Sequence, residues 1–243
     1  MKSDPSAFRP DLAMSLHLTS PTASATSDIQ AALQAAREAL NLYRELAKAN
    51  PDTFRPDLAS SFSNLSCILS NLGQHEAALR VADMAVELYH ELAVDRPDAF
   101  RPDLAGALNN LANHLGELNQ HEDALKAAQE AVALYRELTA ASPGAFEPDV
   151  VRSLIALARC LEAMGRDTEA LRTNREAIAT LREPFLTLPP AFAHWMRPMV
   201  QQYFARAQKL GVEPDWELLA PILAILAPDS SGGDDTDEGS LEP

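Results

Sequence analysis

The chain has 243 residues, of which 47% are hydrophobic and 23% charged, enough to bury a sizeable core. Its net charge of −15 disfavours nucleic-acid binding, which needs a basic surface. Cys67 and Cys160 form no CxxC motif, the N-terminus leads into no signal-peptide core, and the longest apolar run is too short to span a bilayer, so we expect a cytoplasmic protein without a membrane partner.

One hexapeptide recurs along the sequence at a fixed period of 46 residues. Phe-Arg-Pro-Asp-Leu-Ala stands at 8–13, 54–59 and 100–105, and a diverged copy stands at 146–151. A fixed period of this kind is the signature of a repeat architecture. Further positions keep the same register, namely Pro51, Pro97, Pro143 and Pro189; Ala78, Ala124 and Ala170; Tyr43, Tyr89 and Tyr135; and Gly73, Asn119, Gly165 and Gly211.

Each 46-residue unit is predicted to be a pair of antiparallel helices. Pro56 suits the first position of a helix, where its missing N–H is not needed, and Gly73 suits the left-handed residue after the helix end. A second apolar stripe follows until Pro97, which forbids its continuation. No segment alternates with the period of a strand, so we expect an all-α chain. The later units repeat the plan at 102–118 with 121–141 and at 148–164 with 167–183.

The order of large and small residues in each unit resembles the tetratricopeptide repeat family. The matching positions hold Phe62, Leu65, Ser66, Gly73, Ala78 and Ala85; then Leu108, Leu111, Ala112, Asn119, Ala124 and Ala131; then Leu154, Leu157, Ala158, Gly165, Ala170 and Ala177. The family unit has about 34 residues. The longer unit here is similar to the long-helix repeats of kinesin light chains. The resemblance covers roughly residues 8–212 and implies a right-handed α-solenoid of antiparallel helix hairpins.

The chain divides into four parts on this plan. Residues 1–53 are expected to form a degenerate first repeat with a Ser/Thr-rich loop at 19–27, and residues 54–191 form three full repeats. Residues 192–227 are expected to hold a partial repeat and a capping helix. Residues 228–243 carry six acidic and no basic side chains, a composition that predicts a disordered tail.

Two details of the ends follow from the same plan. In the first repeat we expect a short helix at 10–18 and a second helix capped by Asp28. In the last, we expect a helix at 195–210, with Trp195 and Trp216 packing at the C-terminal end.

No catalytic or metal-binding constellation stands out. His90-Glu91 lacks the second histidine of an HExxH motif, and His75 and His121 occupy the same position of two repeats, which indicates duplication. The sequence has no Gly-rich phosphate loop and no GxSxG motif. We therefore expect a non-enzymatic chain without a cofactor or metal. A helical-repeat enzyme with an unrecognised site is the alternative that histidines or carboxylates converging in a closed pocket would favour.

In tetratricopeptide arrays the first helices line a concave groove, and the resemblance implies a protein or peptide partner there. An asparagine amide both donates to and accepts from an extended peptide backbone. Arg152 and Arg159 lie two turns apart and suit a carboxylate. The candidate partner-binding residues are Asn64, Asn109, Asn110, Asn113, Arg152 and Arg159.

A purely structural interpretation of these residues stays open. Asn64 and Asn110 would then hydrogen-bond the neighbouring repeat, while the two arginines would pair with Glu117 and Glu162.

The sequence thus favours an interaction scaffold. The alternative is a regulatory or sensory subunit acting in trans on a signalling enzyme or ATPase. The broken first repeat further suggests a homodimer formed through the N-terminal end, where apolar surface would lack cover.

Overall fold

The computed structural model describes residues 26–226, which form nine helices and no strand. The predicted helix at 10–18, residues 19–25 of the predicted loop at 19–27, and the acidic tail lie outside the described residues. The helices are α2 (Thr26–Ala49), α3 (Pro51–Asn71), α4 (His75–Asp95), α5 (Pro97–Glu117), α6 (His121–Ala141), α7 (Glu147–Ala163), α8 (Asp167–Thr187), α9 (Pro189–Leu210) and α10 (Trp216–Leu226).

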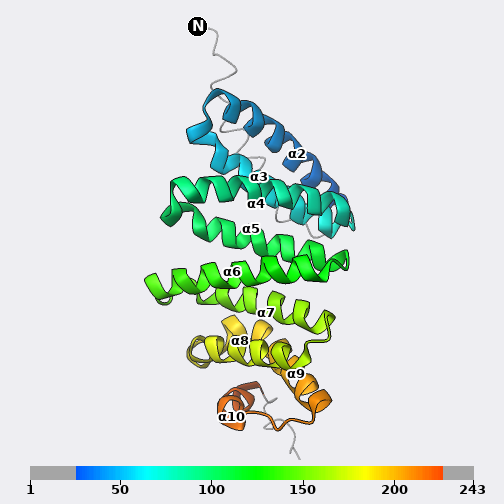
Figure 1. The fold of residues 1–243 in the computed structure, drawn as a ribbon, viewed down its shortest axis with the longest axis vertical. Coiled ribbons are helices and arrows are strands. Elements are labelled where there is room, and N and C mark those ends of the chain that lie inside the picture. The colour runs from blue at the N-terminus through cyan, green and yellow to red at the C-terminus, as the bar shows by residue number, and fades with distance from the viewer. Residues whose placement is uncertain (1–25, 227–243) are drawn as a thin grey trace, which may run out of the picture.

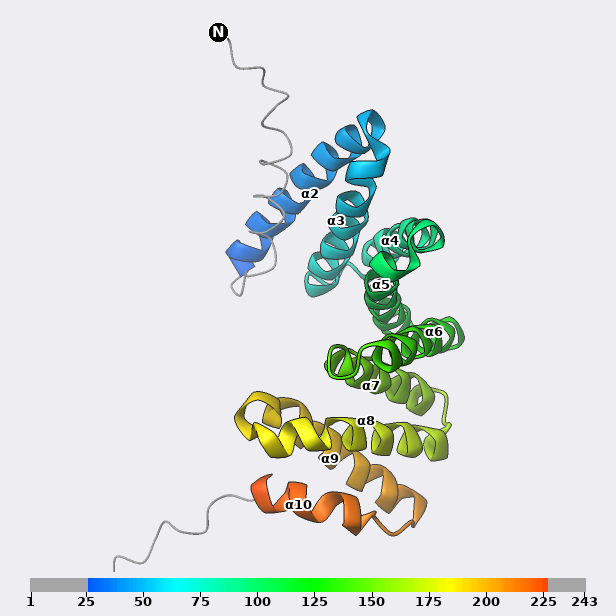
Figure 2. The ribbon, with the colours of Figure 1, turned by 90° about the vertical axis from the view of Figure 1, so that its left-hand side faces the viewer.

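The helices stack in chain order. Each contacts the next, and α5 also contacts α3 and α7, the first helices of the neighbouring units. Figure 1 shows the stack running from α2 at one end to α10 at the other. Figure 2 shows it as an arc, with α4 and α6 on the outer side and α3 and α7 on the inner side. We call the surface presented by α3, α5 and α7 the inner face. The predicted all-α solenoid of helix hairpins is confirmed.

Left-handed residues end the first helix of the second, third, fourth and fifth units, as predicted. After α3, the N–H of Gln74 donates to the carbonyl of Leu69 at 2.9 Å, the bond that closes a Schellman motif. Asparagine also tolerates this conformation, so the third unit keeps the turn without glycine. The four φ values are 71° at Gly73, 58° at Asn119, 70° at Gly165 and 64° at Gly211.

Two of the first helices begin earlier than predicted. α3 starts at Pro51 and α5 at Pro97, so that Pro56 and Pro102 lie inside the helices. The prediction that these helices start at Pro56 and Pro102 is therefore wrong. The earlier prolines already take the first helical position, where no N–H is needed. Each inner proline removes one backbone bond near the helix start, which the remaining turns tolerate.

The first helix of the fourth unit begins later, at Glu147. Gly144 has φ 85° and stands where the second and third units have Asp52 and Asp98, both in the first turn of a helix. A left-handed residue cannot continue a right-handed helix, so this single difference shortens α7. Elsewhere α2 begins at Thr26 rather than after Asp28, and α9 begins six residues before the predicted 195.

Small residues let the hairpins approach closely. Ala78, Ala124 and Ala170 are all 0% exposed, at the position where the repeat pattern places a small residue. Large side chains fill the spaces between them, and Leu154 and Phe185 are also 0% exposed. The core therefore runs the length of the stack, because each hairpin covers the apolar face of its neighbour.

The helix α10 covers the C-terminal end of the stack. The carboxylate of Asp215 accepts the N–H of Leu218 at 3.1 Å, a side-chain cap at the start of this helix. Trp216 is predicted to pack at this end. The centroid of its ring lies 5.8 Å from that of Phe204, but the residue is 54% exposed. The buried side chains of α10 are those of Leu218, Leu219, Ile222 and Leu226.

Candidate functional site

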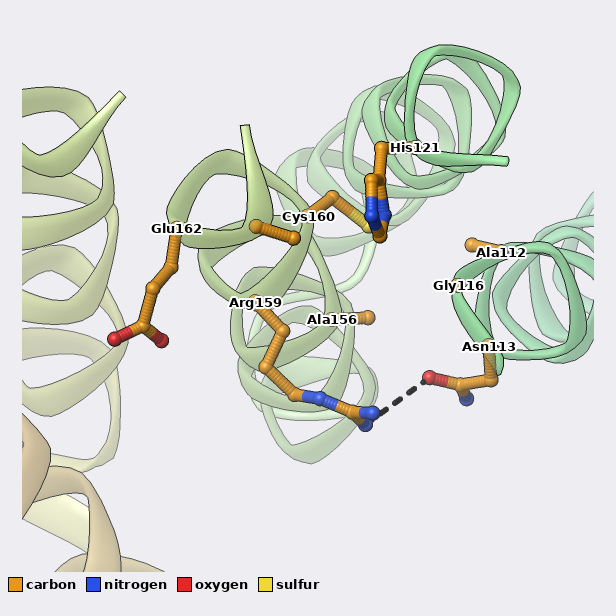
Figure 3. Close-up of a pocket in the computed structure, with 9 residues that line it drawn as sticks. Ala112, Asn113, Gly116, His121, Ala156, Arg159, Cys160 and Glu162 are labelled. Atoms are coloured by element: carbon orange, nitrogen blue, oxygen red, sulfur yellow. Dashed lines mark hydrogen bonds between the residues drawn. The ribbon is translucent and has the colours of Figure 1, made fainter. Parts of the chain in front are cut away.

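A pocket of about 270 Å³ lies on the inner face between α5 and α7. Figure 3 shows the side chains of Asn113 and Arg159 pointing toward one another across it, from one helix each. A guanidinium Nη1–H of Arg159 donates to the Asn113 amide oxygen at 3.4 Å. The lining residues are Ala112, Asn113, Gly116, His121, Ala156, Arg159, Cys160, Glu162 and Ala163.

Arg159 carries a positive charge that no acid in the described chain pairs. It is exposed and forms none of the ion pairs found among residues 26–226. Glu162, one turn away, is held instead by Arg206 of α9 at 2.6 Å. The predicted alternative, in which Arg159 pairs with Glu117 or Glu162, is therefore wrong. The guanidinium keeps donors for a ligand in the pocket.

The other predicted residues are distributed differently. Arg152 is exposed, and its guanidinium Nη2 lies 3.2 Å from a carboxylate oxygen of Asp149 on the same helix. It takes no part in the hydrogen bond between Arg159 and Asn113. Asn110 is half-buried. Asn64 is half-buried too and interacts within the chain.

Asn109 is not on the surface. It is 3% exposed, and its amide Nδ2 donates to the hydroxyl of Ser153 at 2.7 Å. That hydroxyl in turn donates to the carbonyl of Asp149 at 2.9 Å. The residue therefore joins α5 to α7, which corrects its predicted place in the groove.

A polar cluster that the sequence analysis missed joins α3, α4 and α5. The carboxylate of Glu117 accepts from the Ser70 hydroxyl at 2.8 Å and lies 2.8 Å from His75 Nδ1. Its Oε2 also lies 3.6 Å from Nδ1 of His114, which is 4% exposed. These residues belong to three helices, and His75 and Glu117 are 42 positions apart in the sequence, so no local motif indicates the cluster.

The electrostatics of the cluster follow from burial and hydrogen bonding. Burial lowers the pKa of His114, and the neighbouring Glu117 opposes this only in part. Partial burial raises the pKa of Glu117, but hydrogen bonds from Ser70 and His75 outweigh it, so that this pKa is lowered overall. The cluster thus favours an ionised carboxylate beside a neutral buried imidazole.

The two thiols are not poised for nucleophilic chemistry. Burial raises the pKa of Cys67 and of Cys160, which disfavours the reactive thiolate. Among residues 26–226, no three His, Cys, Asp or Glu side chains are placed to hold a metal ion. No helix of this described range is long and apolar enough to cross a membrane.

Comparison with known proteins places the repeat pattern in a family. Two tetratricopeptide repeat profiles match the sequence, one over residues 103–183 and one over residues 58–98, and together they span half of the chain. The chain belongs to the tetratricopeptide repeat family. Membership indicates a protein-interaction scaffold of a fold that is typically non-enzymatic. No curated protein matches the sequence.

Solved structures of the same fold are distant in sequence. The nearly identical TPR-like repeats of a kinesin-light-chain-type protein of Podosopora anserina share 18% identity with a TM-score of 0.58, covering 96% of this chain and 100% of that one. The apo form of RapI shares 14% identity with a TM-score of 0.57, covering 86% and 71%. BtubC (BKLC) from P. vanneervenii shares 14% identity with a TM-score of 0.55, covering 98% and 96%. At these identities the likeness concerns the fold.

Proposed function

We propose that this tetratricopeptide repeat chain is a non-enzymatic scaffold that binds a protein or peptide partner on its inner face, at the pocket between α5 and α7. The observation that carries the proposal is the convergence of the Arg159 guanidinium and the Asn113 amide on an open pocket of about 270 Å³. Arginine donates two parallel hydrogen bonds to a carboxylate, and an asparagine amide both donates and accepts. Together they suit an extended peptide segment that presents a carboxylate.

The walls of the pocket favour close approach of a ligand backbone. Ala112, Gly116, Ala156 and Ala163 contribute no long side chain, and a Cβ added at Gly116 would meet nothing within 4 Å. The small residues leave the polar groups of Asn113 and Arg159 accessible. We propose that Arg152, Asn110 and Asn64 extend this contact surface along the inner face, whereas the buried Asn109 is left out.

The test compares partners captured from native lysate by the wild type and by a double variant, Asn113→Ala with Arg159→Glu. The matched control is Arg80→Glu, because Arg80 is an exposed arginine of α4 that forms none of the ion pairs found among the described residues and lies outside the pocket. A partner bound through the pocket is retained by the wild type and the control and lost by the double variant. Circular dichroism should show equal helical content in all three proteins.

A partner retained equally by the double variant would contradict binding in the pocket. It would move the interface to an end or to the outer side of the arc. That outcome favours the alternative function, a regulatory or sensory subunit acting in trans on a signalling enzyme or ATPase.

A homodimer formed through the N-terminal end, a cytoplasmic location and the four-part division of the chain are further proposals from the sequence. Sedimentation equilibrium tests the homodimer, and a strict monomer at high protein concentration would contradict it.

A further inference from the structure

A second pocket lies at the C-terminal end of the stack, between α8 and the connection from α9 to α10. Its volume is about 370 Å³, and Leu171, Arg172, Arg175, Tyr203, Leu210 and Val212 line it. Val212 is 51% exposed, so an apolar side chain of the wall faces solvent. The pocket is larger than the one between α5 and α7 and shares no residue with it.

The charge around this pocket differs from that of the equivalent surface in the second unit. Thr168, which also lines it, stands where that unit has Glu76, and Arg175 stands where it has Asp83. Arg175 is occupied, because its Nε donates to the carboxylate of Asp215 at 2.7 Å. Arg172 forms none of the ion pairs found among residues 26–226. An apolar pocket with an exposed cation at its rim suits an apolar side chain flanked by carboxylates.

The sequence that follows α10 has this chemistry. Residues 228–243 carry six acidic and no basic side chains, in a chain whose other acids are balanced in part by 20 basic ones. Leu241 is the only large apolar side chain in that segment, and it lies between Glu238 and Glu242. A leucine with acids on both sides complements the apolar wall and Arg172.

The segment is also long enough to reach. The helix α10 has 11 residues and therefore spans about 16 Å, from Trp216, four positions after the lining residue Val212, to Leu226. Leu241 follows Leu226 by fifteen positions, and a random coil of that length has a root-mean-square span of about 20 Å. A tether matched to its span gives an effective concentration on the order of millimolar, so even a weak contact is populated.

We propose that the acidic segment 227–243 docks in this pocket of its own chain, with Leu241 against the apolar wall and a neighbouring carboxylate on Arg172. The pocket then has an occupant built into the chain, and an external partner with a similar acidic, leucine-containing segment has to displace it. This inference does not depend on the pocket between α5 and α7.

Hydrogen exchange of the full-length protein, followed by mass spectrometry, tests the docking. The compared proteins are the wild type, Leu241→Ser and Arg172→Glu. The matched control is Arg80→Glu, because Arg80 holds the same repeat position as Arg172 two units earlier. Loss of a buried leucine weakens docking by about tenfold or more. Amides of the α9–α10 connection should therefore exchange several-fold faster in Leu241→Ser and Arg172→Glu than in the wild type and the control.

Two results would overturn the proposal. Equal exchange of the connection in all four proteins would show that the segment does not cover the pocket. Protection that increases with protein concentration would assign the pocket to the segment of a second copy. Unchanged circular dichroism in the variants keeps either result from being attributed to unfolding, and Arg172 and Arg80 are both exposed.

Discussion

Protonation of His114 is expected to destabilise the junction between the second and third repeats. The imidazole is 4% exposed, and its Nε2 lies 3.4 Å from the Ser66 hydroxyl of α3. Burial lowers its pKa in the folded state, whereas in the unfolded chain it titrates near 6.5. Below about pH 6.5 the unfolded chain then binds more protons, so the free energy of unfolding falls as the pH falls. One proton accounts for at most about 2 kcal/mol between pH 6.5 and 5.

The assay is urea unfolding followed by circular dichroism at several pH values, comparing the wild type with His114→Gln. Burial raises the pKa of Asp83 and of Asp103, and these groups act in the opposite direction in acid, so the difference between proteins is the informative quantity. The control is His194→Gln, because His194 is exposed on α9. His114→Gln should lose stability less steeply on acidification, while the control follows the wild type. Equal slopes for His114→Gln and the wild type would refute the reasoning.

The same unfolding assay checks five further substitutions. Ala131→Leu should lower the free energy of unfolding by about 1–3 kcal/mol, because it overpacks a position that is 0% exposed. Ala133→Leu, on the exposed side of the same helix, should change it by no more than about 0.5 kcal/mol. Equal losses in the two variants would contradict tight stacking. Gly165→Ala should lower the free energy of unfolding by about 1 kcal/mol, because φ is 70° at this residue. Gly116→Ala should raise it by about 0.5–1 kcal/mol, because Gly116 is helical and an added Cβ would meet nothing within 4 Å. Changes of the same sign in both variants would argue against these backbone conformations. Phe185→Ala should cost about 3–5 kcal/mol, and a loss below 1 kcal/mol would contradict its burial.

The repeat period predicts most of the fold because stacking imposes the same demand on every unit. It places the left-handed turns at Gly73 and Asn119 and the fully buried alanines correctly. It misplaces the starts of α3 and α5, because each of these helices has two prolines near its start. In α3, Pro51 takes the first helical position and Pro56 lies inside the first turns, and a proline is compatible with either place. It also misses the effect of Gly144, a one-residue departure whose consequence is a shorter α7.

The candidate site is harder to predict, because neighbouring residues of one helix meet different surroundings. Asn109 and Asn110 are adjacent in sequence and lie about 100° apart around the helix, so that one is buried against Ser153 and the other is half-buried. The cluster of His75, His114 and Glu117 needs contacts between helices that only the register of stacking decides.

Departures from the period are therefore the better guide to what a repeat protein binds. Positions that stack stay alike between units, because any larger side chain there would push the hairpins apart. Positions that face solvent are free of that demand, and the position of Arg159 is held by Cys67 and Asn113 in the preceding units. Arg175 likewise replaces Asp83 of the second unit at the C-terminal pocket. Both pockets lie where one unit has exchanged its side-chain chemistry. Arg159→Asn restores the residue that the preceding unit has at this position, and it breaks no ion pair of the described residues, so it is a mild way to remove the charge of the pocket between α5 and α7. Arg175→Asp is not equivalent, because it would also break the ion pair with Asp215, which caps α10.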